Sequence, residues 1–264
     1  MDPETFTVEA RPFESNFFDL SICRLGINRA SDPALFAREL ASFVGDSDHD
    51  VIETNLDLRD LSLASALEDH DFRLVDSRIT FITLVSVDDP DVTVAGEDSG
   101  FDIRMLTDDD LDQVVELTHA NLTDNPGFVS RYKNEGIFGD QSARRWFGAW
   151  IRDSAGNESA RTAVAEVGGD VVAFFTYQKQ DHYADGLPLY RGILSAVDPA
   201  YRGHHLHILL QPYLFDAFPE SSFYVQNATQ LSNYAVIKNH IRSNRHLEHC
   251  ELTYMRTRSA RREQ

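Results

Sequence analysis

The amino-acid sequence predicts an α/β fold, and three segments support that prediction. Residues 189–197 have the apolar alternation of a strand and end at an Asp-Pro pair, after which apolar residues recur at helical spacing through residue 214. Two further apolar segments flank a hairpin signal at residues 168–170. Upstream, residues 33–87 alternate between helical and strand patterns. Strands and helices therefore follow one another along most of the chain.

The first 90 residues are predicted to form a small domain of their own. Pro33 at a first turn and apolar residues on one face predict a helix over residues 33–44, and residues 61–70 predict a second helix. Strands are expected on both sides of these helices, over residues 16–28, 51–56 and 72–87. Structural support is the expected role of this domain, and a contribution to a substrate pocket is the alternative.

A linker and a second domain are expected to follow. The acidic segment 88–100 carries glycine and proline and lacks large apolar periodicity, so we place a linker at residues 91–100. The second domain is predicted to span residues 101–257, and residues 258–264 are expected to be a basic tail.

Within the second domain, three segments precede the hairpin. Thr107 is expected to cap a helix whose first turn carries Asp108, Asp109 and Asp110. Residues 121–140 are loop-like and rich in aromatic side chains. Residues 141–152 predict an amphipathic helix whose two tryptophans belong to the core.

The charge balance argues against one class of partner. With 43 acidic residues against 24 Lys and Arg, the chain has a formal net charge of −19, which argues against nucleic acid. No apolar run approaches the length of a bilayer crossing and no signal-peptide core is present, so we expect a cytoplasmic protein with no membrane partner. Cys23 and Cys250 are expected to be reduced core thiols. Anionic ligands would need a local basic patch and screening of the other charges by salt.

The break between the strand at residues 189–197 and the next helix is the strongest candidate site. A tight turn that leads directly into a helix leaves the first backbone N–H groups without intrahelical acceptors. It also places the positive end of the helix dipole there, where a pyrophosphate would be stabilised. The residues by themselves predict an anion site.

The segment VDPAYRGHHLHILL resembles the acetyl-CoA-binding segment of the GNAT superfamily of N-acetyltransferases. In that family a strand ends in V-x-P-x-Y-R-G, and the pattern [QR]-x-x-G-x-[GA] opens the next helix. Arg202 matches the first residue of this pattern and Gly203 follows it, while His205 and His207 stand where glycines are expected. The resemblance implies a GNAT fold with a mixed sheet, preceded by a smaller domain that is a partial copy of it, with acetyl-CoA as cosubstrate.

A downstream stretch is similar to the family ending N-x-x-A-x-x-x-Y-x-x-x-G-F. Asn233 matches the residue that touches coenzyme A, His240 occupies the position of the tyrosine proton donor, and Arg245-His246 replaces Gly-Phe. In detail, the T-Q-x-x-N-x-A segment and the N-terminal E-S-N-F-F-D-L look most like dTDP-fucosamine acetyltransferases. Those enzymes acetylate an amino sugar that is carried on a nucleotide.

The resemblance implies roles for individual residues. Arg202 and the N–H groups of the turn would hold pyrophosphate, and charged His204 or His205 would replace what the glycines provide, with a resulting pH dependence. His240 is the expected proton donor to the leaving thiolate, Tyr234 is the reserve, and a surface histidine is the alternative interpretation of His240. The expected coenzyme ligands are Ser195, Ala196, Val197, Arg202, Gly203, His204, His205, Leu206, His207 and Asn233.

The expected acceptor is the primary amine of a small molecule. Phe128, Arg131 and Tyr132 fall in the region that borders the acceptor pocket of the family, and packing is their alternative role. Asp181 and His182 are the candidates for the base, for which a water relay would also serve.

Other functions remain as alternatives. The histidines at positions 204–207 and 246–249 lack partners at a recognised zinc spacing, so no metal is expected, and no G-x-S-x-G elbow indicates a hydrolase. The main rival is a catalytically silent GNAT fold that binds a ligand or partner. N-acetylation of an amino acid, a polyamine or a protein N-terminus is a nearer alternative, and a homodimer is left open.

Overall fold

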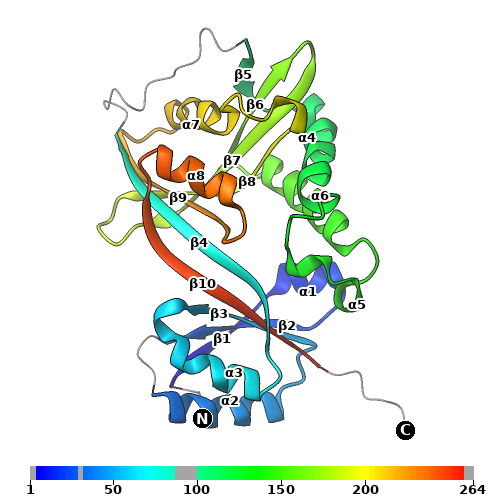
Figure 1. Cartoon of the computed structure of the whole chain (residues 1–264), viewed down its shortest axis with the longest axis vertical. Coiled ribbons are helices and arrows are strands. Elements are labelled where there is room, and N and C mark those ends of the chain that lie inside the picture. Colours follow the sequence, from blue (N-terminus) through cyan, green and yellow to red (C-terminus); the bar gives the residue numbers. More distant parts are fainter. Residues whose placement is uncertain (1–3, 29–31, 87–99, 259–264) are drawn as a thin grey trace. The chain divides into compact units, whose positions relative to one another are not determined.

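The computed structural model describes residues 4–28, 32–86 and 100–258. Within these residues ten strands form one mixed sheet, hydrogen-bonded in the order β1-β2-β3-β10-β4-β9-β8-β7-β6-β5 (Figure 1). The pairs β2–β3 and β8–β9 are parallel, whereas β1–β2, β3–β10, β5–β6, β6–β7 and β7–β8 are antiparallel. The predicted mixed α/β fold is confirmed.

The bounds of the elements follow the labels of Figure 1. The strands are β1 (Phe6–Ala10), β2 (Ile22–Ile27), β3 (Val51–Asp57), β4 (Arg73–Ser86), β5 (Asp102–Met105), β6 (Ala160–Val167), β7 (Asp170–His182), β8 (Pro188–Val197), β9 (Ser222–Gln230) and β10 (His246–Thr257). The α-helices are α1 (Pro12–Phe18), α2 (Pro33–Asp46), α3 (Ala64–Asp69), α4 (Leu111–Thr118), α5 (Glu135–Phe138), α6 (Ser142–Gly156), α7 (Leu206–Asp216) and α8 (Tyr234–Arg242).

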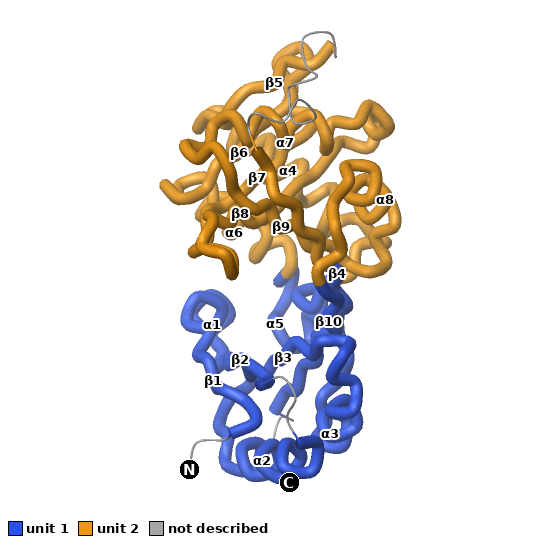
Figure 2. The backbone as a smooth tube through the Cα atoms, turned by 90° about the vertical axis from the view of Figure 1, so that its left-hand side faces the viewer, with its two compact units in different colours: residues 1–79, 130–142, 249–264 blue, residues 80–129, 143–248 orange. Residues whose placement is uncertain are grey.

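The chain divides into two compact units, coloured separately in Figure 2. Unit 1 comprises the described residues of 1–79, 130–142 and 249–264, and unit 2 comprises residues 80–129 and 143–248. The predicted boundaries at residues 90 and 101 do not coincide with these units, because two segments expected in the second domain pack in unit 1. Most of the predicted linker and tail lies outside the described residues.

Unit 1 is built around the predicted helix–strand alternation. Phe36 and Leu40 on α2 are buried against Ile52 and Leu56 of β3, as the apolar face of residues 33–44 predicts. The expected strand over residues 16–28 is wrong in its first part. Residues through Phe18 belong to α1, which begins at a proline and ends where Asp19 adopts a left-handed conformation (φ 54°).

Unit 2 holds the helix and strands of the candidate site. The apolar side of α7, including Leu206, Leu210 and Leu214, packs on Phe175 of β7 and Phe223 of β9 in one core cluster. This burial explains the helical spacing of apolar residues after the turn. The α4 helix also packs on β7 and β8.

Several local predictions for unit 2 are confirmed. Thr107 and Asp110 form a reciprocal capping box at the start of the turn that leads into α4. Gly168 and Gly169, with φ of 63° and 96°, make the two-residue turn between β6 and β7. Of the two tryptophans on α6, Trp146 is buried and Trp150 is half-buried.

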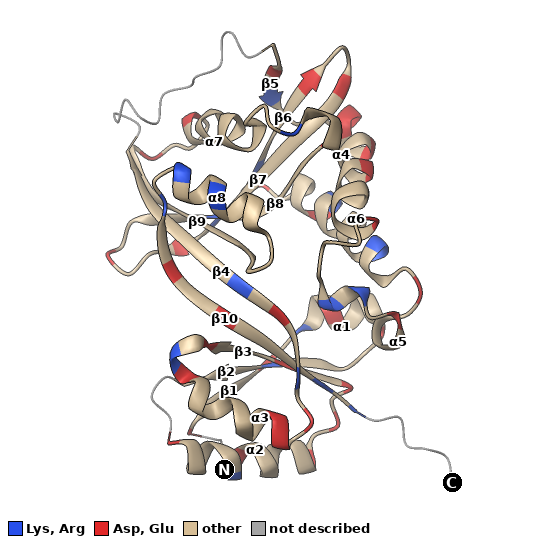
Figure 3. Ribbon diagram, in the orientation of Figure 1, with Lys and Arg blue, Asp and Glu red and all other residues tan. Residues whose placement is uncertain are grey.

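Charge is distributed over elements of both units (Figure 3). The α7 helix is an exception, because its sequence LHILLQPYLFD contains one acidic residue and no Lys or Arg. Any positive charge near the start of α7 therefore comes from the preceding turn or from other elements. Among the described helices, none is both long and apolar enough to cross a membrane.

Candidate functional site

Strands β8 and β9 part from each other in unit 2. Their parallel pairing ends at Arg191, which lies opposite Gln226. Beyond this point β8 continues to Val197 and stays paired with β7, while β9 continues to Gln230. The wedge between the two strands leaves backbone groups of residues 192–197, on the side of β8 that faces β9, available to an extended ligand. The expected ligands Ser195, Ala196 and Val197 lie on this stretch.

The apex of the wedge is closely packed around Gly192, the first residue after the last pair. A Cβ atom at this position would collide with the side chain of Asn227 on β9 and would lie 3.3 Å from the ring of Phe175. Across the β7–β8 ladder, the partner of Gly192 is Tyr177. The missing side chain at Gly192 makes room for Asn227 between the strands, which accounts for glycine at this position.

The turn after β8 has the geometry of the predicted anion site. Asp198 Oδ1 accepts a hydrogen bond from the N–H of Ala200 (2.8 Å), which fixes the first part of the turn. Gly203 then has φ +92° and open space where a Cβ would point. In the described part of the chain, no acceptor is found for the backbone N–H groups of residues 203–206. Four consecutive donors at the start of α7 are therefore free to bind an anion.

The histidines of the turn occupy different environments. His204 and His205 are exposed, and His205 is the N-cap residue of α7 in a left-handed conformation (φ 59°, ψ 21°) without a side-chain cap bond. A glycine would adopt this conformation without the penalty that a Cβ imposes. His207 was expected at the turn, but its side chain lies on the buried face of α7, with its ring centroid 4.9 Å from that of Phe175.

Arg202, the expected pyrophosphate ligand, is exposed and directly precedes the free donors in the sequence. Its Nη2 donates to Oδ1 of the buried Asn121 at 2.8 Å. Asn121 belongs to a π-helical turn, His119–Thr123, that follows α4. Such turns are frequent at functional sites, and this one orients the arginine.

Two candidate residues stand at the start of α8: Asn233, the expected coenzyme ligand, and Tyr234, the reserve proton donor. Asn233 is the N-cap residue of α8, where Oδ1 accepts from the N–H of Val236 (3.4 Å) and Nδ2 donates to Thr229 (3.0 Å). Tyr234 is 70% exposed. These capping bonds give Asn233 a structural role that requires no coenzyme. Its predicted contact with coenzyme A stays a prediction.

A cluster of buried polar side chains, which we call the apex cluster, lies beside Gly192. It is formed by Tyr177, His207, Gln211, Asn227, His240 and Arg245, all of them less than 10% exposed. The Tyr177 hydroxyl donates to Gln211 Oε1 at 3.0 Å, and Arg245 Nη2 donates to the same oxygen. Gln211 Nε2 in turn donates to the backbone oxygen of His207 at 2.6 Å. Strands β7 and β9 and helices α7 and α8 thus contribute to one polar interior.

His240 belongs to this cluster and not to the surface. Its ring is 2% exposed and packs against Phe81 and His207, with centroid distances of 5.0 and 5.6 Å. Burial, assisted by the charge of Arg245, lowers the pKa of His240 to about 2. The ring is therefore neutral near pH 7, and the imidazolium that the predicted proton donor requires is not populated in the unliganded chain.

The residues expected to border the acceptor pocket fall into different units. Phe128 belongs to unit 2, where its ring packs edge-on against Phe147 at 5.9 Å. Arg131 and Tyr132 belong to unit 1. The Tyr132 ring stacks on Phe18 at 5.6 Å, so the packing interpretation describes its observed environment.

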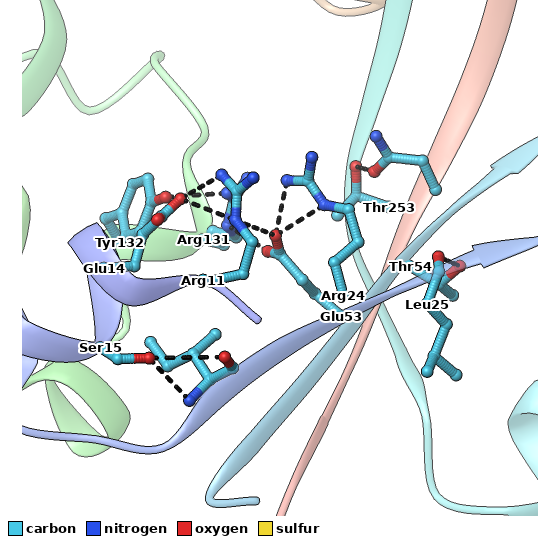
Figure 4. A network of polar contacts seen from close by, with 12 residues as sticks. Arg11, Glu14, Ser15, Arg24, Leu25, Glu53, Thr54, Arg131, Tyr132 and Thr253 are labelled. Carbon is cyan, nitrogen blue, oxygen red and sulfur yellow. Dashed lines mark hydrogen bonds and ion pairs between the residues drawn. The ribbon is translucent and has the colours of Figure 1, made fainter. Parts of the chain in front are cut away.

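Arg131 is part of a charge network inside unit 1, drawn in Figure 4. The carboxylate of Glu53 on β3 is 4% exposed and lies 3.1 Å from Arg131 Nε and 2.5 Å from Arg24 Nη2. Arg11 Nε lies 3.8 Å from the same carboxylate. Burial raises the pKa of Glu53, but the three arginines outweigh burial and hold that pKa below its usual value. The Arg131 guanidinium is thus committed to an ion pair of unit 1.

Asp181 and His182, the candidate bases, are exposed at the far end of β7. His182 pairs with Pro188, four residues before Gly192. At a rise of about 3.3 Å per residue, this places them roughly 13 Å along the strands from the apex. The structure does not bring them together with the other candidates.

Sequence reasoning missed most of the apex cluster. Tyr177 and Asn227 lie in segments with strand patterns and Gln211 lies in a segment with a helical pattern, and none of these patterns indicates a polar cluster. Arg245 carried a signal, because it stands where the family pattern has a glycine before the final phenylalanine. A charged residue in an otherwise buried ending marks a position with a polar partner or a function.

No protein-family model matches this sequence, and none of the curated proteins matches it. Solved structures do match. A GCN5-related N-acetyltransferase from Sphaerobacter thermophilus aligns with a TM-score of 0.60 and 13% identity, over 96% of this chain and 76% of that one. A tandem GNAT protein from the clavulanic acid biosynthesis pathway aligns with a TM-score of 0.54 and 16% identity, over 89% of this chain and 75% of that one.

A functionally unknown conserved protein from Staphylococcus epidermidis gives a TM-score of 0.61 at 10% identity, over 90% of this chain and 84% of that one. Identities this low establish the fold alone. The chain has the fold of the GNAT acetyltransferases, as the sequence resemblance implied.

Proposed function

We propose that this protein is an acetyl-CoA-dependent N-acetyltransferase that acts on the primary amine of a small molecule. One observation carries the proposal. The four free N–H groups of residues 203–206 stand at the start of α7, directly after the strand whose other edge is open. A coenzyme that combines a pyrophosphate with an extended amide-containing arm matches both features.

The residues of the site divide between the parts of the coenzyme. The turn amides and Arg202 would hold the pyrophosphate, and the open edge of β8 over residues 192–197 would bind the pantetheine arm. Bound acetyl-CoA supplies the activated acetyl group. A coenzyme whose pyrophosphate lies at the turn would direct its thioester toward the apex cluster, where polar groups are buried and act strongly.

The acceptor class rests on sequence resemblance. A nucleotide-linked amino sugar is the leading acceptor, and an amino acid, a polyamine or a protein N-terminus is the alternative. In each case the uncharged amine is the nucleophile, so transfer requires loss of a proton from the ammonium group. A water relay is the favoured route for that proton, since Asp181 and His182 lie far from the apex.

Titration calorimetry with acetyl-CoA tests the proposal. The wild-type protein should bind one equivalent, and Arg202→Ala should weaken binding by about tenfold or more because a charge-assisted hydrogen bond to phosphate is lost. Arg152→Ala is the matched control, since Arg152 is an exposed arginine of unit 2 that pairs with Asp112 on the surface. Absence of binding at both low and high salt would contradict the proposal.

The rival function is a catalytically silent GNAT fold that binds a ligand or partner and transfers no acetyl group. The burial of His240 favours this rival, because it removes the expected acid from the unliganded site. Release of free thiol from acetyl-CoA, measured against a panel of amines, separates the two. Amine-dependent release supports the transferase, and tight binding without release on any amine supports the silent fold.

A further inference from the structure

Arg245 carries a buried charge that no carboxylate of the described residues balances. Arg245 follows α8 in the sequence, and the residue is 8% exposed. Within the described ranges, its Nε and Nη1 atoms have no hydrogen-bond partner and the guanidinium forms no ion pair. Nη2 alone is engaged, by Gln211 and, at 3.4 Å, by the hydroxyl of Tyr177.

The neighbours of Arg245 cannot neutralise it. Gln211 is uncharged, and burial raises the pKa of Tyr177, so that its phenol stays protonated. The two imidazoles are neutral, because burial, with a smaller contribution from the charge of Arg245, lowers the pKa of His207 to about 3 and that of His240 to about 2. His240 also has an unpartnered buried atom, Nδ1.

An unbalanced buried charge costs free energy, and an anion placed beside it recovers that cost. The position of the cluster indicates which anion. Tyr177, which touches Arg245, is the ladder partner of Gly192 at the apex of the wedge. The pantetheine arm that enters the wedge from the turn ends in sulfur, and acetyl transfer leaves that sulfur as a thiolate.

We propose that Arg245 stabilises the thiolate of coenzyme A as it leaves, so that this site needs no proton donor. The inference rests on the proposed function. The lone pair of the amine nitrogen forms the new C–N bond to the acetyl carbon. The C–S bond then breaks, its electron pair goes to sulfur, and the amine proton goes to solvent. The guanidinium pairs with the resulting charge and is itself unchanged.

The affinity for free coenzyme A at different pH values tests this inference. A thiol of ordinary pKa, about 8.5 for cysteine, ionises more readily when bound beside a cation. Between pH 6.5 and pH 8.5 the affinity for coenzyme A should therefore rise at least about fivefold relative to S-methyl-coenzyme A, which cannot ionise. Any other group that titrates affects both ligands alike, and Tyr177, His207 and His240 keep their protonation states in this range.

Variants of Arg245 test whether its guanidinium causes the pH-dependent rise in affinity for coenzyme A. Arg245→Gln should abolish the rise in relative affinity, and Arg245→Lys should keep part of it. The control is Arg242→Gln at the last residue of α8, an exposed arginine three residues before Arg245, and it should behave like the wild type. The Gln variant should melt no lower than the wild type, because it removes an unbalanced charge.

Each outcome has a distinct meaning. Binding of coenzyme A with no pH-dependent preference over S-methyl-coenzyme A would overturn the thiolate site and leave the proposed function standing. An unchanged preference in Arg245→Gln would also overturn it. Failure of the wild type to bind coenzyme A at all would overturn the proposed function, and the inference with it. If the Gln variant does not fold, the wild-type preference and the Lys variant decide.

Discussion

Each unit contains a pair of parallel strands joined through a helix. The two helices differ in how the free backbone N–H groups at their N-terminal ends are satisfied. In unit 1, α2 follows β2 and precedes β3, and the carboxylate of Asp32 caps α2 by accepting from the N–H of Leu35 (2.8 Å). In unit 2, α7 stands between β8 and β9, and its N-cap residue His205 offers no acceptor. The N-terminal end of α2 thus already contacts a carboxylate of the chain, whereas the N-terminal end of α7 has no side-chain cap.

The buried charges of the two units show the same contrast. Glu53 in unit 1 is surrounded by three arginines, whereas Arg245 in unit 2 has no carboxylate partner among the described residues. Closed networks of the first kind hold a fold together, because each charge finds its counter-charge within the chain. The open arrangement in unit 2 leaves the counter-charge to be supplied by a ligand. The comparison is therefore consistent with the proposal that unit 1 has a supporting role and that the coenzyme binds to unit 2.

The largest expected effect is in the closed network. Glu53→Gln should destabilise unit 1 by about 3–5 kcal/mol, because three arginines lose the buried charge that they share. Hydrogen exchange of the β3 amides measures this unit directly, since local protection reports its own opening. Glu251→Gln is the control, as its pair with Arg78 is more exposed and should be worth about 1 kcal/mol or less. Equal losses in the two variants would break the comparison.

Acid should open unit 2 before unit 1. His207 and His240 bind no proton at pH 5 when folded but do so when unfolded, since their ordinary pKa is 6.5. The unfolded state then binds more protons, so stability falls as the pH drops below about 6.5, by on the order of 2 kcal/mol for each histidine and about 4 kcal/mol for the pair at pH 5. The lowered pKa of Glu53 makes its contribution present above the ordinary carboxyl pKa and lost only in stronger acid.

Hydrogen exchange on the strands of the two units across pH 7 to 4 checks this order. His240→Gln should flatten the loss in β7–β9, because one of the two titrating rings is gone. If β3 lost protection at a higher pH than β8, the assignment of neutral histidines to unit 2 would be contradicted.

The smallest effects concern the two helix starts. Asp32→Ala should cost unit 1 about 1 kcal/mol, since a cap bond is lost. His205→Gly should leave unit 2 unchanged or stabilise it by up to about 1 kcal/mol, because glycine adopts the left-handed conformation freely. Urea unfolding, monitored by hydrogen exchange, measures the change in stability of each unit separately. A loss of stability in His205→Gly would show that the imidazole has a structural role.

Much of the fold could be predicted from local patterns. The α2 helix, the Gly168-Gly169 hairpin and the strand–turn–helix around Asp198 all depend on spacing and turn chemistry within a few residues. The boundaries of α1 and β2 could not be predicted in this way, because Phe17 and Phe18 continue the apolar pattern of the next strand. The division into units was also beyond reach, since residues 130–142 join unit 1 through contacts with residues far away in the sequence.

The site was predictable in its backbone and less so in its side chains. The turn at Gly203 could be found from the motif, because proline, glycine and the helix that follows fix its geometry. The apex cluster could not, since Tyr177 and Arg245 are 68 residues apart and meet only in the folded unit. The sequence pattern singles out His240, but the environment of this residue depends on Phe81 and His207, which no local pattern places beside it.

A crystal structure of the protein with coenzyme A tests the central claim most directly. The account predicts the pyrophosphate on the N–H groups of residues 203–206 and the sulfur beside the guanidinium of Arg245. A coenzyme bound elsewhere, or a sulfur that lies away from Arg245 with the turn amides still free, would contradict it.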